Sequence, residues 1–443
     1  MTIKGSNETS RRKFLKNVAS AAAGTIILPN IIPSSAIGAT PPSDRIVMAV
    51  IGSGSQGRSN MNDFMRLKQW EGKLQFVAVC DVDKTNLERG STMINTYHKN
   101  KSCRTYEDYR ELLEKEPLDA VSIAIPDHWH SFIYIAAANK KVNMYGEKPL
   151  ARSLKESKMI LDAVKRNGII FQTGSWQRSQ PHFRHACELV RNGRIGKINY
   201  AEVGLPNGGR SVGTPPVQAI PEGLNWDFWL GSAPKVPFRG ILHWDWRWIL
   251  DYSGGQLTDW AGHHIDIAQW GLGMDRTGPV EVSGMGVYPH EGIYDVPVEY
   301  DITCKFANGL TMRVANQTRL PRGAGATWYG EKGWIRVDRG AQRGLQASDP
   351  AILAETMGAN DTRLYESNNH WNNFLECVRD KKETIAPAEV AHRAISVALL
   401  GEVAMQTGEV IKWDPDKEEI IGNERASRLM LRPLRAPWTL PTA

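Results

Sequence analysis

A glycine-rich loop between an apolar strand and a helix constrains the fold of this chain more than any other feature. Residues 45–51 form an apolar, β-rich run that leads into Gly52, Gly54 and Gly57, spaced as G-x-G-x-x-G, and 58–67 has a helical pattern. Glycines at this spacing allow a tight turn and let the backbone approach a pyrophosphate at the helix amino terminus. Strand, glycine loop and helix in this order predict a dinucleotide-binding unit.

The next strand ends at an acidic residue, which favours one kind of dinucleotide. The apolar run 74–80 leads to Asp81, whose carboxylate can accept hydrogen bonds from both ribose hydroxyls and would repel a 2′-phosphate. We therefore expect NAD rather than NADP. Ser55 and Gln56 lie within the glycine loop and are expected to contact the cofactor together with its glycines. A glycine-rich turn without a ligand is the alternative.

Helices and strands continue to alternate after this point, which predicts that residues 44–170 form a doubly wound parallel sheet. Pro126 and His130 follow one predicted strand, and Glu147 and Lys148 follow the next. Ligands bind at the carboxyl ends of the strands in such sheets, so we expect all four residues to line the cofactor crevice. The proline after Lys148 disfavours helix and would hold the lysine in a turn; an ordinary exposed loop lysine is the alternative.

The pattern changes after residue 170 to segments typical of antiparallel strands. Such segments lie at 198–203, 280–287, 299–306, 310–317 and 333–338. We expect residues 171–425 to form a second α/β domain with a large, mostly antiparallel open sheet. One face of this sheet would cover the cofactor domain and the other would be available to a second subunit. Residues 426–443 are expected to form an extended tail.

A polar stripe on an otherwise apolar helix is the second chemical feature. The helical segment 256–271 places Asp259, His263 and Asp266 at i, i+4 and i+7, on one stripe. We expect this helix to be buried and its stripe to face a cavity, because a buried aspartate and histidine need partners or a function. A structural Asp–His hydrogen bond is the alternative. We expect no metal, since His263 and its neighbour His264 point about 100° apart on a helix.

Tryptophans are concentrated near this helix and suggest a sugar site, because indole faces stack on the C–H face of a pyranose. Between residues 222 and 270 they are Trp226, Trp229, Trp244, Trp246, Trp248, Trp260 and Trp270. Some of them are expected to be core residues. We expect Arg178, Arg247 and Tyr252 to contact the substrate together with Asp259 and His263.

The first 39 residues are interpreted as a targeting signal that is not part of the fold. Arg11 and Arg12, followed by Lys-Phe-Leu-Lys, precede a modest apolar run at 18–32, the pattern of a twin-arginine export signal. That run is shorter than the roughly 20 residues of a membrane span. We therefore expect a periplasmic or extracytoplasmic protein with no membrane span in its mature form.

Charge and cysteine content exclude other classes. The first 39 residues carry a net charge of +4 out of +6 for the whole chain, so the remainder is nearly neutral and gives no reason to expect nucleic-acid binding. The five cysteines are scattered and never form a CxxC pair, so we expect neither a disulfide framework nor a zinc site.

The combination of these motifs resembles the Gfo/Idh/MocA family, which includes glucose–fructose oxidoreductase and inositol dehydrogenase. The glycine loop, the turn that begins at Pro126, the Glu147-Lys148-Pro149 sequence and the Asp259–His263 pair carry the resemblance, which extends over about 44–425. It implies an N-terminal Rossmann domain with bound NAD(P), and an α/β domain whose open sheet is used in oligomers. A homodimer or homotetramer is therefore expected.

The resemblance also assigns roles to residues of this chain. The family's catalytic lysine falls on Lys148, its D-x-x-x-H pair on Asp259 and His263, and its later aspartate on Asp266. The family's threonine-proline-asparagine turn is Ile-Pro-Asp here, so the chain departs from the family pattern at Asp127.

Our leading hypothesis is reversible hydride transfer between NAD and a secondary hydroxyl of a sugar, glycoside or polyol. His263 would accept the hydroxyl proton, Asp259 would orient it or bind the substrate, and Lys148 would stabilise negative charge on the reacting oxygen. An exported enzyme meets little free NAD, so a redox-neutral glycosidase or lyase that works through a keto-sugar is the alternative. A non-catalytic sugar-binding or NAD-binding protein is a third hypothesis.

Overall fold

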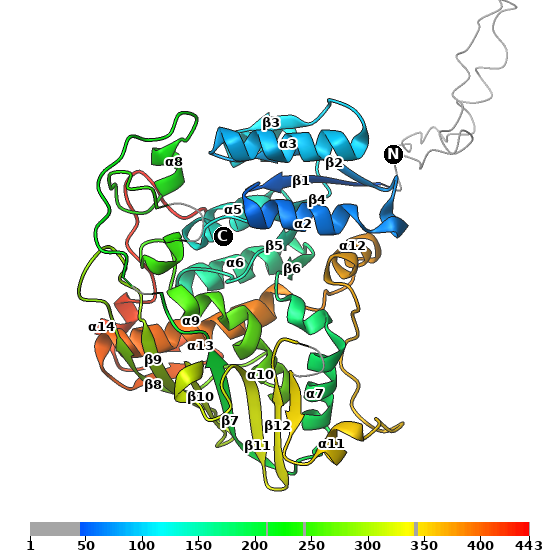
Figure 1. The fold of residues 1–443 in the computed structure, drawn as a ribbon, viewed down its shortest axis with the longest axis vertical. Coiled ribbons are helices and arrows are strands. Elements are labelled where there is room, and N and C mark those ends of the chain that lie inside the picture. The colour runs from blue at the N-terminus through cyan, green and yellow to red at the C-terminus, as the bar shows by residue number, and fades with distance from the viewer. Residues whose placement is uncertain (1–44, 210, 242–244, 341–343, 443) are drawn as a thin grey trace, which may run out of the picture. The chain divides into compact units, whose positions relative to one another are not determined.

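Two β-sheets organise the chain in the computed structural model, which describes residues 45–209, 211–241, 245–340 and 344–442 (Figure 1). The export signal expected in residues 1–39 lies outside the described residues. The first sheet ends at residue 173 and the second begins at residue 198. Both sheets belong to one compact unit, Arg45–Ala443.

The first sheet is parallel throughout and has the strand order β3-β2-β1-β4-β5-β6. Its strands are β1 (Ile46–Ile51), β2 (Leu74–Cys80), β3 (Arg104–Tyr106), β4 (Ala120–Ile123), β5 (Asn143–Gly146) and β6 (Phe171–Thr173). The connecting helices are α2 (Ser55–Met65), α3 (Lys84–His98), α4 (Tyr109–Lys115), α5 (His130–Asn139) and α6 (Leu154–Asn167). The strand order reverses between β1 and β4, which is where such sheets bind ligands. The predicted doubly wound parallel sheet is confirmed.

The second sheet is mixed, with the strand order β13-β12-β11-β7-β10-β9-β8-β14-β15. Its strands are β7 (Ile198–Leu205), β8 (Glu281–Val287), β9 (Glu299–Lys305), β10 (Thr311–Asn316), β11 (Gly325–Gly330), β12 (Gly333–Val337), β13 (Leu345–Ala347), β14 (Ile411–Asp414) and β15 (Glu419–Ile420). The pair β7–β10 is parallel and the other pairs are antiparallel. The expected large, mostly antiparallel sheet is therefore confirmed.

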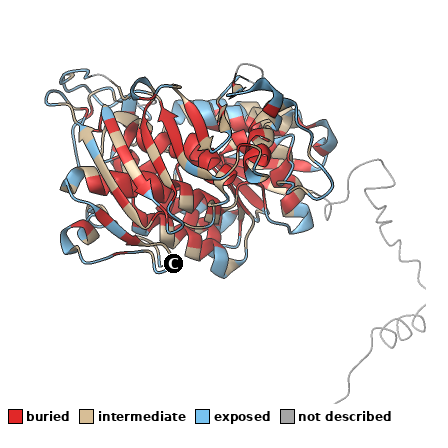
Figure 2. Cartoon of the chain, turned by 90° about the horizontal axis from the view of Figure 1, so that it is seen from below, coloured by how far each residue is buried: buried red, intermediate tan, exposed pale blue. Residues whose placement is uncertain are grey.

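Among the described residues, helices cover one face of the second sheet and leave the other open. The covering helices are α7 (Pro181–Arg191), α10 (Asp266–Leu272) and α13 (Ala388–Thr407) (Figure 1). A Cβ on Gly401 would lie 2.4 Å from Cδ1 of Ile302, so a glycine lets α13 approach β9 closely. Met285 and Val287, 64% and 50% exposed, are on β8. The strands show alternating buried and exposed bands in Figure 2, as a sheet covered on one side requires.

The remaining helical elements of the described ranges are mostly short. They are η3 (Lys68–Trp70), η4 (Asp127–Trp129), η5 (Trp176–Ser179), α8 (Trp226–Leu230), η6 (Asp245–Trp248), α9 (Gly255–Asp259), η7 (Ala261–Ile265), η8 (Gln317–Arg319), α11 (Pro350–Ala354), α12 (His370–Asp380) and α14 (Glu424–Arg428). Of the helices in these ranges, none combines the length and apolar composition that crossing a bilayer requires.

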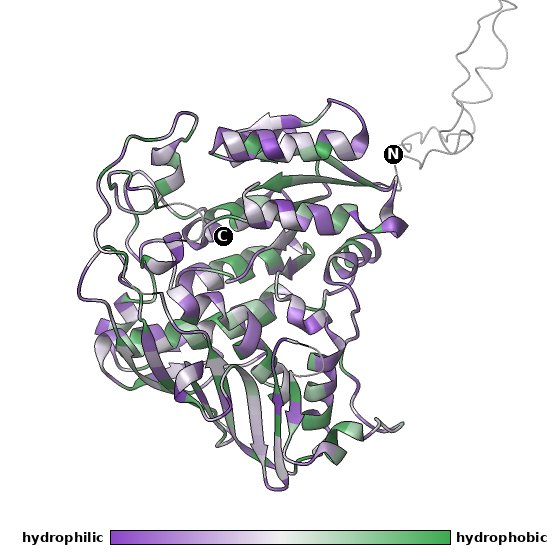
Figure 3. Ribbon diagram, viewed as in Figure 1, coloured by the Kyte–Doolittle hydropathy of each residue, from purple (hydrophilic) through white to green (hydrophobic). Residues whose placement is uncertain are grey.

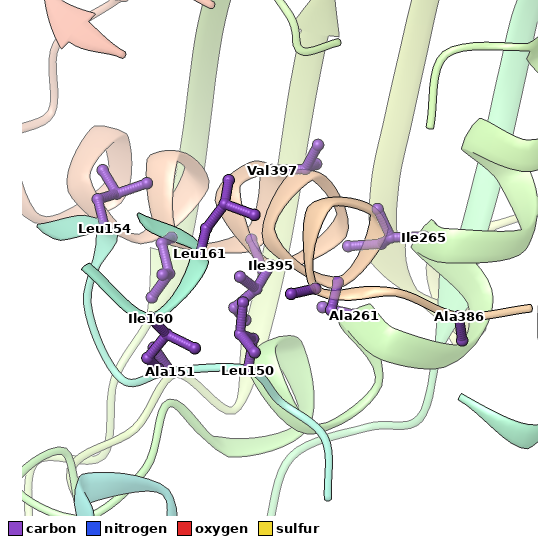
Figure 4. Close-up of a cluster of buried hydrophobic side chains, with 14 of the residues drawn as sticks. Leu150, Ala151, Leu154, Ile160, Leu161, Ala261, Ile265, Ala386, Ile395 and Val397 are labelled. Atoms are coloured by element: carbon purple, nitrogen blue, oxygen red, sulfur yellow. The ribbon is translucent and has the colours of Figure 1, made fainter. Parts of the chain in front are cut away.

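A continuous hydrophobic core joins the two sheets. Leu150 follows the Lys148 turn and packs in the same buried cluster as Ala261 and Ile265 of η7 and Ile395 of α13 (Figure 4). Figure 3 shows the same segregation by hydropathy, with hydrophobic residues along β1. The turn that carries Lys148 and the helix that carries His263 are thus held against each other by buried apolar surface, the main stabilising term in folding.

The predicted single helix over 256–271 is wrong in its middle. The chain forms α9, then the π-helical turn η7, then α10. A π-helical turn has wider hydrogen-bond spacing than an α-helix and so changes the angular phase of the residues that follow it. Asp259 and Asp266 therefore do not share one stripe: Asp259 bonds to Lys148, whereas Asp266 bonds to Arg178.

Arg178 has a structural position that differs from the predicted substrate contact. Its side chain is 3% exposed and donates two hydrogen bonds of 2.8 Å to the Asp266 carboxylate and a third, of 3.1 Å, to Asp275. Its guanidinium also lies over the Trp270 ring, 4.8 Å from the ring centre. This closed network ties η5 to α10.

We expect Arg178→Met to lower the free energy of unfolding by about 3–5 kcal/mol, because it leaves a buried carboxylate without its partner. Chemical denaturation measures the loss. Lys115→Met, which removes an exposed ion pair with Glu111, is the control and should change stability little. A variant of unchanged stability with a raised KM would instead support the substrate contact predicted from the sequence.

Candidate active site

The glycine loop after β1 has room for a ligand in front of α2. Gly52 has φ +83°, and a Cβ there would lie 2.1 Å from the Ala124 carbonyl oxygen; a Cβ on Gly57 would lie 1.9 Å from the Gly52 carbonyl oxygen. Only glycine fits these two positions. A Cβ on Gly54 would meet nothing within 4 Å. The loop therefore closes tightly on the sheet and leaves open space at the helix amino terminus, as a bound pyrophosphate requires.

A pocket with about 1300 Å³ of space, part of it open to solvent, extends from this loop along the strand ends. The predicted site residues that line it are Gly52, Gly54, Ser55, Gln56, Asp81, Pro126, Glu147, Lys148 and Arg247. Gly57, His130, Arg178, Tyr252, Asp259 and His263 are not among its lining residues. The glycine cradle and the acidic residue beyond it fit a dinucleotide.

Asp81 lies at the end of β2, at the edge of the pocket. One carboxylate oxygen accepts hydrogen bonds from Ser53 N–H at 2.8 Å and from its hydroxyl at 3.3 Å, and the other accepts from Asp83 N–H at 2.9 Å. Burial raises the pKa of Asp81 to about 6 even though these bonds lower it. The bonds fix the carboxylate in place, and its remaining acceptor sites can receive ribose hydroxyls.

Glu147 and His130 fix the loops that surround the pocket. Glu147 accepts hydrogen bonds from Gln56 and Asn60 at 3.1 and 3.0 Å, so it links the Lys148 turn to the glycine loop and α2. His130 is fully buried; its ring nitrogens lie 2.6 Å from the Pro149 carbonyl oxygen and 3.1 Å from the Ile125 carbonyl oxygen. His130 therefore holds the two turns together from behind the pocket rather than lining it as predicted.

Lys148 joins the first sheet to α9. Its ammonium donates to the Asp259 carboxylate at 2.8 Å and to the Asp259 backbone carbonyl at 3.2 Å. Arg247 Nε donates to the same carboxylate oxygen at 3.4 Å. Burial raises the pKa of Asp259, but the charges of Lys148 and Arg247 outweigh burial and hold the pKa below its usual value. Asp259 is therefore ionised and anchors both cations.

His263 follows on η7, one residue after the glycine that packs on Lys148. A Cβ on Gly262 would lie 2.9 Å from Lys148 Cβ. The His263 side chain is 3% exposed, and its Nδ1 has no hydrogen-bond partner among the described residues. Burial, together with the charges of Lys148 and Arg339, lowers the pKa of His263 well below its ordinary value. The imidazole is therefore neutral near pH 7 and can accept a proton.

Asp127, where the chain departs from the family pattern, lies inside the pocket. Its side chain is 3% exposed and accepts a hydrogen bond from the Ser253 hydroxyl at 2.7 Å. Burial raises the pKa of Asp127 to about 7, and the Asp259 charge adds to the rise. The carboxyl is thus partly protonated near neutral pH and can donate as well as accept a hydrogen bond.

A segment from the second half of the chain closes over the ribose side of the pocket. Lys84 N–H donates to the Gly223 carbonyl at 2.9 Å, and Asn225 N–H donates to the Val82 carbonyl at 3.0 Å. Leu224, which pairs with Asp83, also lines the pocket. These contacts place residues 222–230 directly beside the acidic loop that follows β2.

The tail after α14 holds this segment against the first sheet. Arg435 donates to the Asp227 carboxylate at 2.7 Å and to the Gly231 carbonyl. The Trp438 ring lies 4.9 Å from that of Trp129 and 5.9 Å from that of Phe228, and both of these residues line the pocket. Residues 222–230 form a cover over this side of the pocket. This cover is held on both sides by contacts between residues distant in the sequence.

The tryptophans predicted for a sugar site do not gather in one place. Trp226 and Trp229 stack on each other, with ring centres 4.8 Å apart, and Tyr252 packs edge-on against Trp229. Trp246 lines the pocket under the Arg247 guanidinium. Trp244 lies outside the described residues. Trp260 is different, because it lies beside His263 with ring centres 5.3 Å apart.

Several pocket residues were not predicted from the sequence. Among them are Asn86, Glu107, Leu224 and Phe228. No local motif marks them, because contacts between distant segments bring them to the pocket. Asn86 alone had a local signal, since it lies on the helix directly after the acidic loop. Among the described residues, no group of three or more histidine, cysteine or acidic side chains is arranged to hold a metal ion.

Family models match most of the described chain. Residues 46–175 match the oxidoreductase family's NAD-binding Rossmann fold, and residues 210–440 match its C-terminal α/β domain. The scyllo-inositol 2-dehydrogenase (NAD(+)) of Bacillus subtilis is 32% identical over 180 residues, which are 41% of this chain and 42% of that protein. Levoglucosan dehydrogenase of Pseudarthrobacter phenanthrenivorans is 37% identical over 167 residues, 38% of this chain and 36% of that protein. The matches span less than half of either relative.

A solved structure covers more of the chain at lower identity. The WlbA dehydrogenase from Bordetella pertussis, crystallised in complex with NADH and UDP-GlcNAcA, has a TM-score of 0.61 and 16% identity. The match covers 84% of this chain and 99% of that one, and it shows that the fold is shared. With both halves matched by its models, the chain belongs to the Gfo/Idh/MocA family of oxidoreductases, and NAD is the cofactor of its Rossmann domain.

Proposed function

We propose that this protein oxidises a secondary hydroxyl of a sugar, glycoside or polyol. The observation that carries the proposal is the buried Lys148–Asp259 pair at the edge of the cofactor pocket, with a neutral histidine beside it. The inositol and levoglucosan dehydrogenases among the relatives support this substrate class.

Lys148 polarises the reacting oxygen in this proposal. Its ammonium has three N–H donors, and two interactions, with the carboxylate and the carbonyl of Asp259, hold it in place. Because Lys148 also lines the pocket, a further donor can point to a substrate oxygen there. A donor fixed before the reaction stabilises the negative charge that develops on that oxygen.

His263 accepts the hydroxyl proton. Its lowered pKa keeps the imidazole neutral, and its Nδ1 is not engaged by any described residue. Asp259 keeps Lys148 in place and does not itself take the proton, because the pKa of Asp259 is held low. When bound, NAD takes up the carbon hydrogen with its electron pair, so that the alcohol becomes a carbonyl.

The cofactor is held tightly in this proposal. Residues 222–230 lie over the acidic loop, and the tail carrying Arg435 and Trp438 fastens them. Export by the twin-arginine pathway, which we also propose, would make such retention useful, since little free NAD is available outside the cytoplasm. The open face of the second sheet, with exposed Met285 and Val287, supports a homo-oligomer.

We expect Lys148→Met and His263→Gln to retain bound nicotinamide but to lose roughly 10²- to 10⁴-fold in turnover, because each removes one proton-transfer or charge-stabilising group. Absorbance of the purified protein gives its nicotinamide content, and turnover is followed with a panel of polyols, sugars, glycosides and keto-glycosides. Lys68→Met, on the exposed surface of η3, is the matched control. Nearly full activity in either site variant would show that the assigned role is wrong.

The same panel tests the redox-neutral alternative. A dehydrogenase leaves reduced nicotinamide and a keto product. A glycosidase or lyase that works through a keto-sugar releases product without net reduction, and deuterium from the solvent enters the carbon next to the oxidised one. The second result would replace our proposal by that alternative.

We expect Trp438→Ala to release nicotinamide faster than the wild-type protein during dialysis, because it removes the ring that packs against Trp129 and Phe228. The fraction of protein that retains cofactor is measured over time by absorbance. Thr439→Ala, an exposed neighbour in the same tail, is the control. Equal release rates for the wild type and both variants would contradict a role for the tail in retention.

A further inference from the structure

Arg339 is a cation held between two indoles beside the candidate catalytic histidine. Its guanidinium carbon lies 4.9 Å from the ring centre of Trp176 and 4.3 Å from that of Trp260. With the Gln177 amide oriented to satisfy both of its polar groups, its oxygen accepts a hydrogen bond from Arg339 Nε at 3.0 Å. Two aromatic faces and one hydrogen bond therefore fix the plane of the guanidinium.

The same residues surround His263. Its ring centre lies 6.2 Å from that of Trp176 and 5.3 Å from that of Trp260, with interplanar angles of 70° and 71°. In that orientation the Gln177 amide donates to the His263 backbone carbonyl at 3.2 Å. Arg339 and His263 thus share three neighbours, and the guanidinium is close enough for its charge to act on the imidazole.

The carboxylates near Arg339 are engaged by other groups. Asp259 is bonded to Lys148 and Arg247. Asp338 accepts hydrogen bonds from Arg336 and from the Arg339 backbone N–H, and it lies 3.3 Å from His264 Nε2. Within the described ranges, no carboxylate oxygen lies within 4 Å of the Arg339 guanidinium.

This arrangement differs from that of the other cations in the site. The charge of Lys148 is balanced by Asp259, and Arg178 is balanced by Asp266 and Asp275. Arg339 is exposed to solvent yet held between two rings, and although the charges of Asp338 and Asp259 act on it, no described carboxylate forms an ion pair with its guanidinium. A fixed guanidinium that keeps open donors next to a reaction site is suited to bind an anion.

We propose that Arg339 binds a carboxylate of the substrate, so that the protein acts on sugar acids such as uronic acids and their glycosides. This inference rests on the proposed function and narrows its substrate class. A single guanidinium matches the single charge and planar shape of a carboxylate, and it can bind both oxygens. A phosphate dianion is the other source of the same charge, and it would leave one negative charge without a partner.

Binding to the holoenzyme, measured by calorimetry with its own nicotinamide in place, tests the inference. The probes are glucuronate, methyl glucuronide, glucose and glucose 6-phosphate. We expect both acids to bind at least 10-fold more tightly than glucose, and we expect that preference to decrease as salt screens the charge. Equal affinity for acid and neutral sugars, or tight binding of glucose 6-phosphate alone, would overturn the carboxylate assignment.

Substitutions of Arg339 test whether this residue causes the preference for acids. Arg339→Gln should lose the preference for the acids by 10-fold or more and leave glucose binding unchanged, because it removes the charge and keeps the polarity. Arg339→Lys should keep part of the preference for the acids, since an ammonium keeps the charge but cannot bind both carboxylate oxygens in one plane. The control is Arg379→Gln. It removes an arginine of α12 that lies over the Trp70 ring. Unchanged acid binding in Arg339→Gln would overturn the inference.

The failure of this inference and that of the proposed function are distinguishable. Oxidation of neutral sugars or polyols without any preference for acids would overturn the role of Arg339 and leave the proposed function standing. Tight, Arg339-dependent binding of acids that never changes the nicotinamide absorbance would overturn the proposed function and support the acid-binding role.

Discussion

The ion pair between Lys148 and Asp259 is the interaction on which the site depends. It links the turn after β5 in the first sheet to α9 in the second half of the chain. Both side chains are nearly buried, and a buried charge is costly unless its partner is present. The pair therefore forms only when the two halves of the chain are packed together, and the cofactor pocket and His263 take their relative positions from it.

The apolar core makes this pairing possible. Leu150 follows the lysine turn and packs near Ala261 and Ile265, which flank His263 on η7 (Figure 4). The π-helical geometry of η7 directs Asp259 toward Lys148 and Asp266 toward Arg178. The end of α9 thus supplies one carboxylate to the site, and the start of α10 supplies another to a structural ion pair.

The cover over the pocket shows how distant segments complete a site. The acidic loop after β2 bonds to residues 223–225, and Arg435 and Trp438 of the tail hold that cover in place. The side chains around His263 are assembled in the same way, because Trp176 follows β6 of the first sheet and Arg339 follows β12 of the second. The first group of residues lines the pocket, and in our proposal the second holds the Arg339 guanidinium for a substrate carboxylate.

Short-range patterns and the family resemblance were enough to predict the two sheets, the glycine loop with Asp81, and Lys148, Asp259 and His263 as candidate site residues. Which side chains meet depends instead on the tertiary structure. It places His130 behind the pocket and Arg178 in a closed ion pair. Both residues come shortly after the end of a strand, which is where site residues were expected. The tertiary structure also places Arg339 beside His263. Such contacts depend on the packing of segments far apart in the chain, to which local periodicity and spacing are not sensitive.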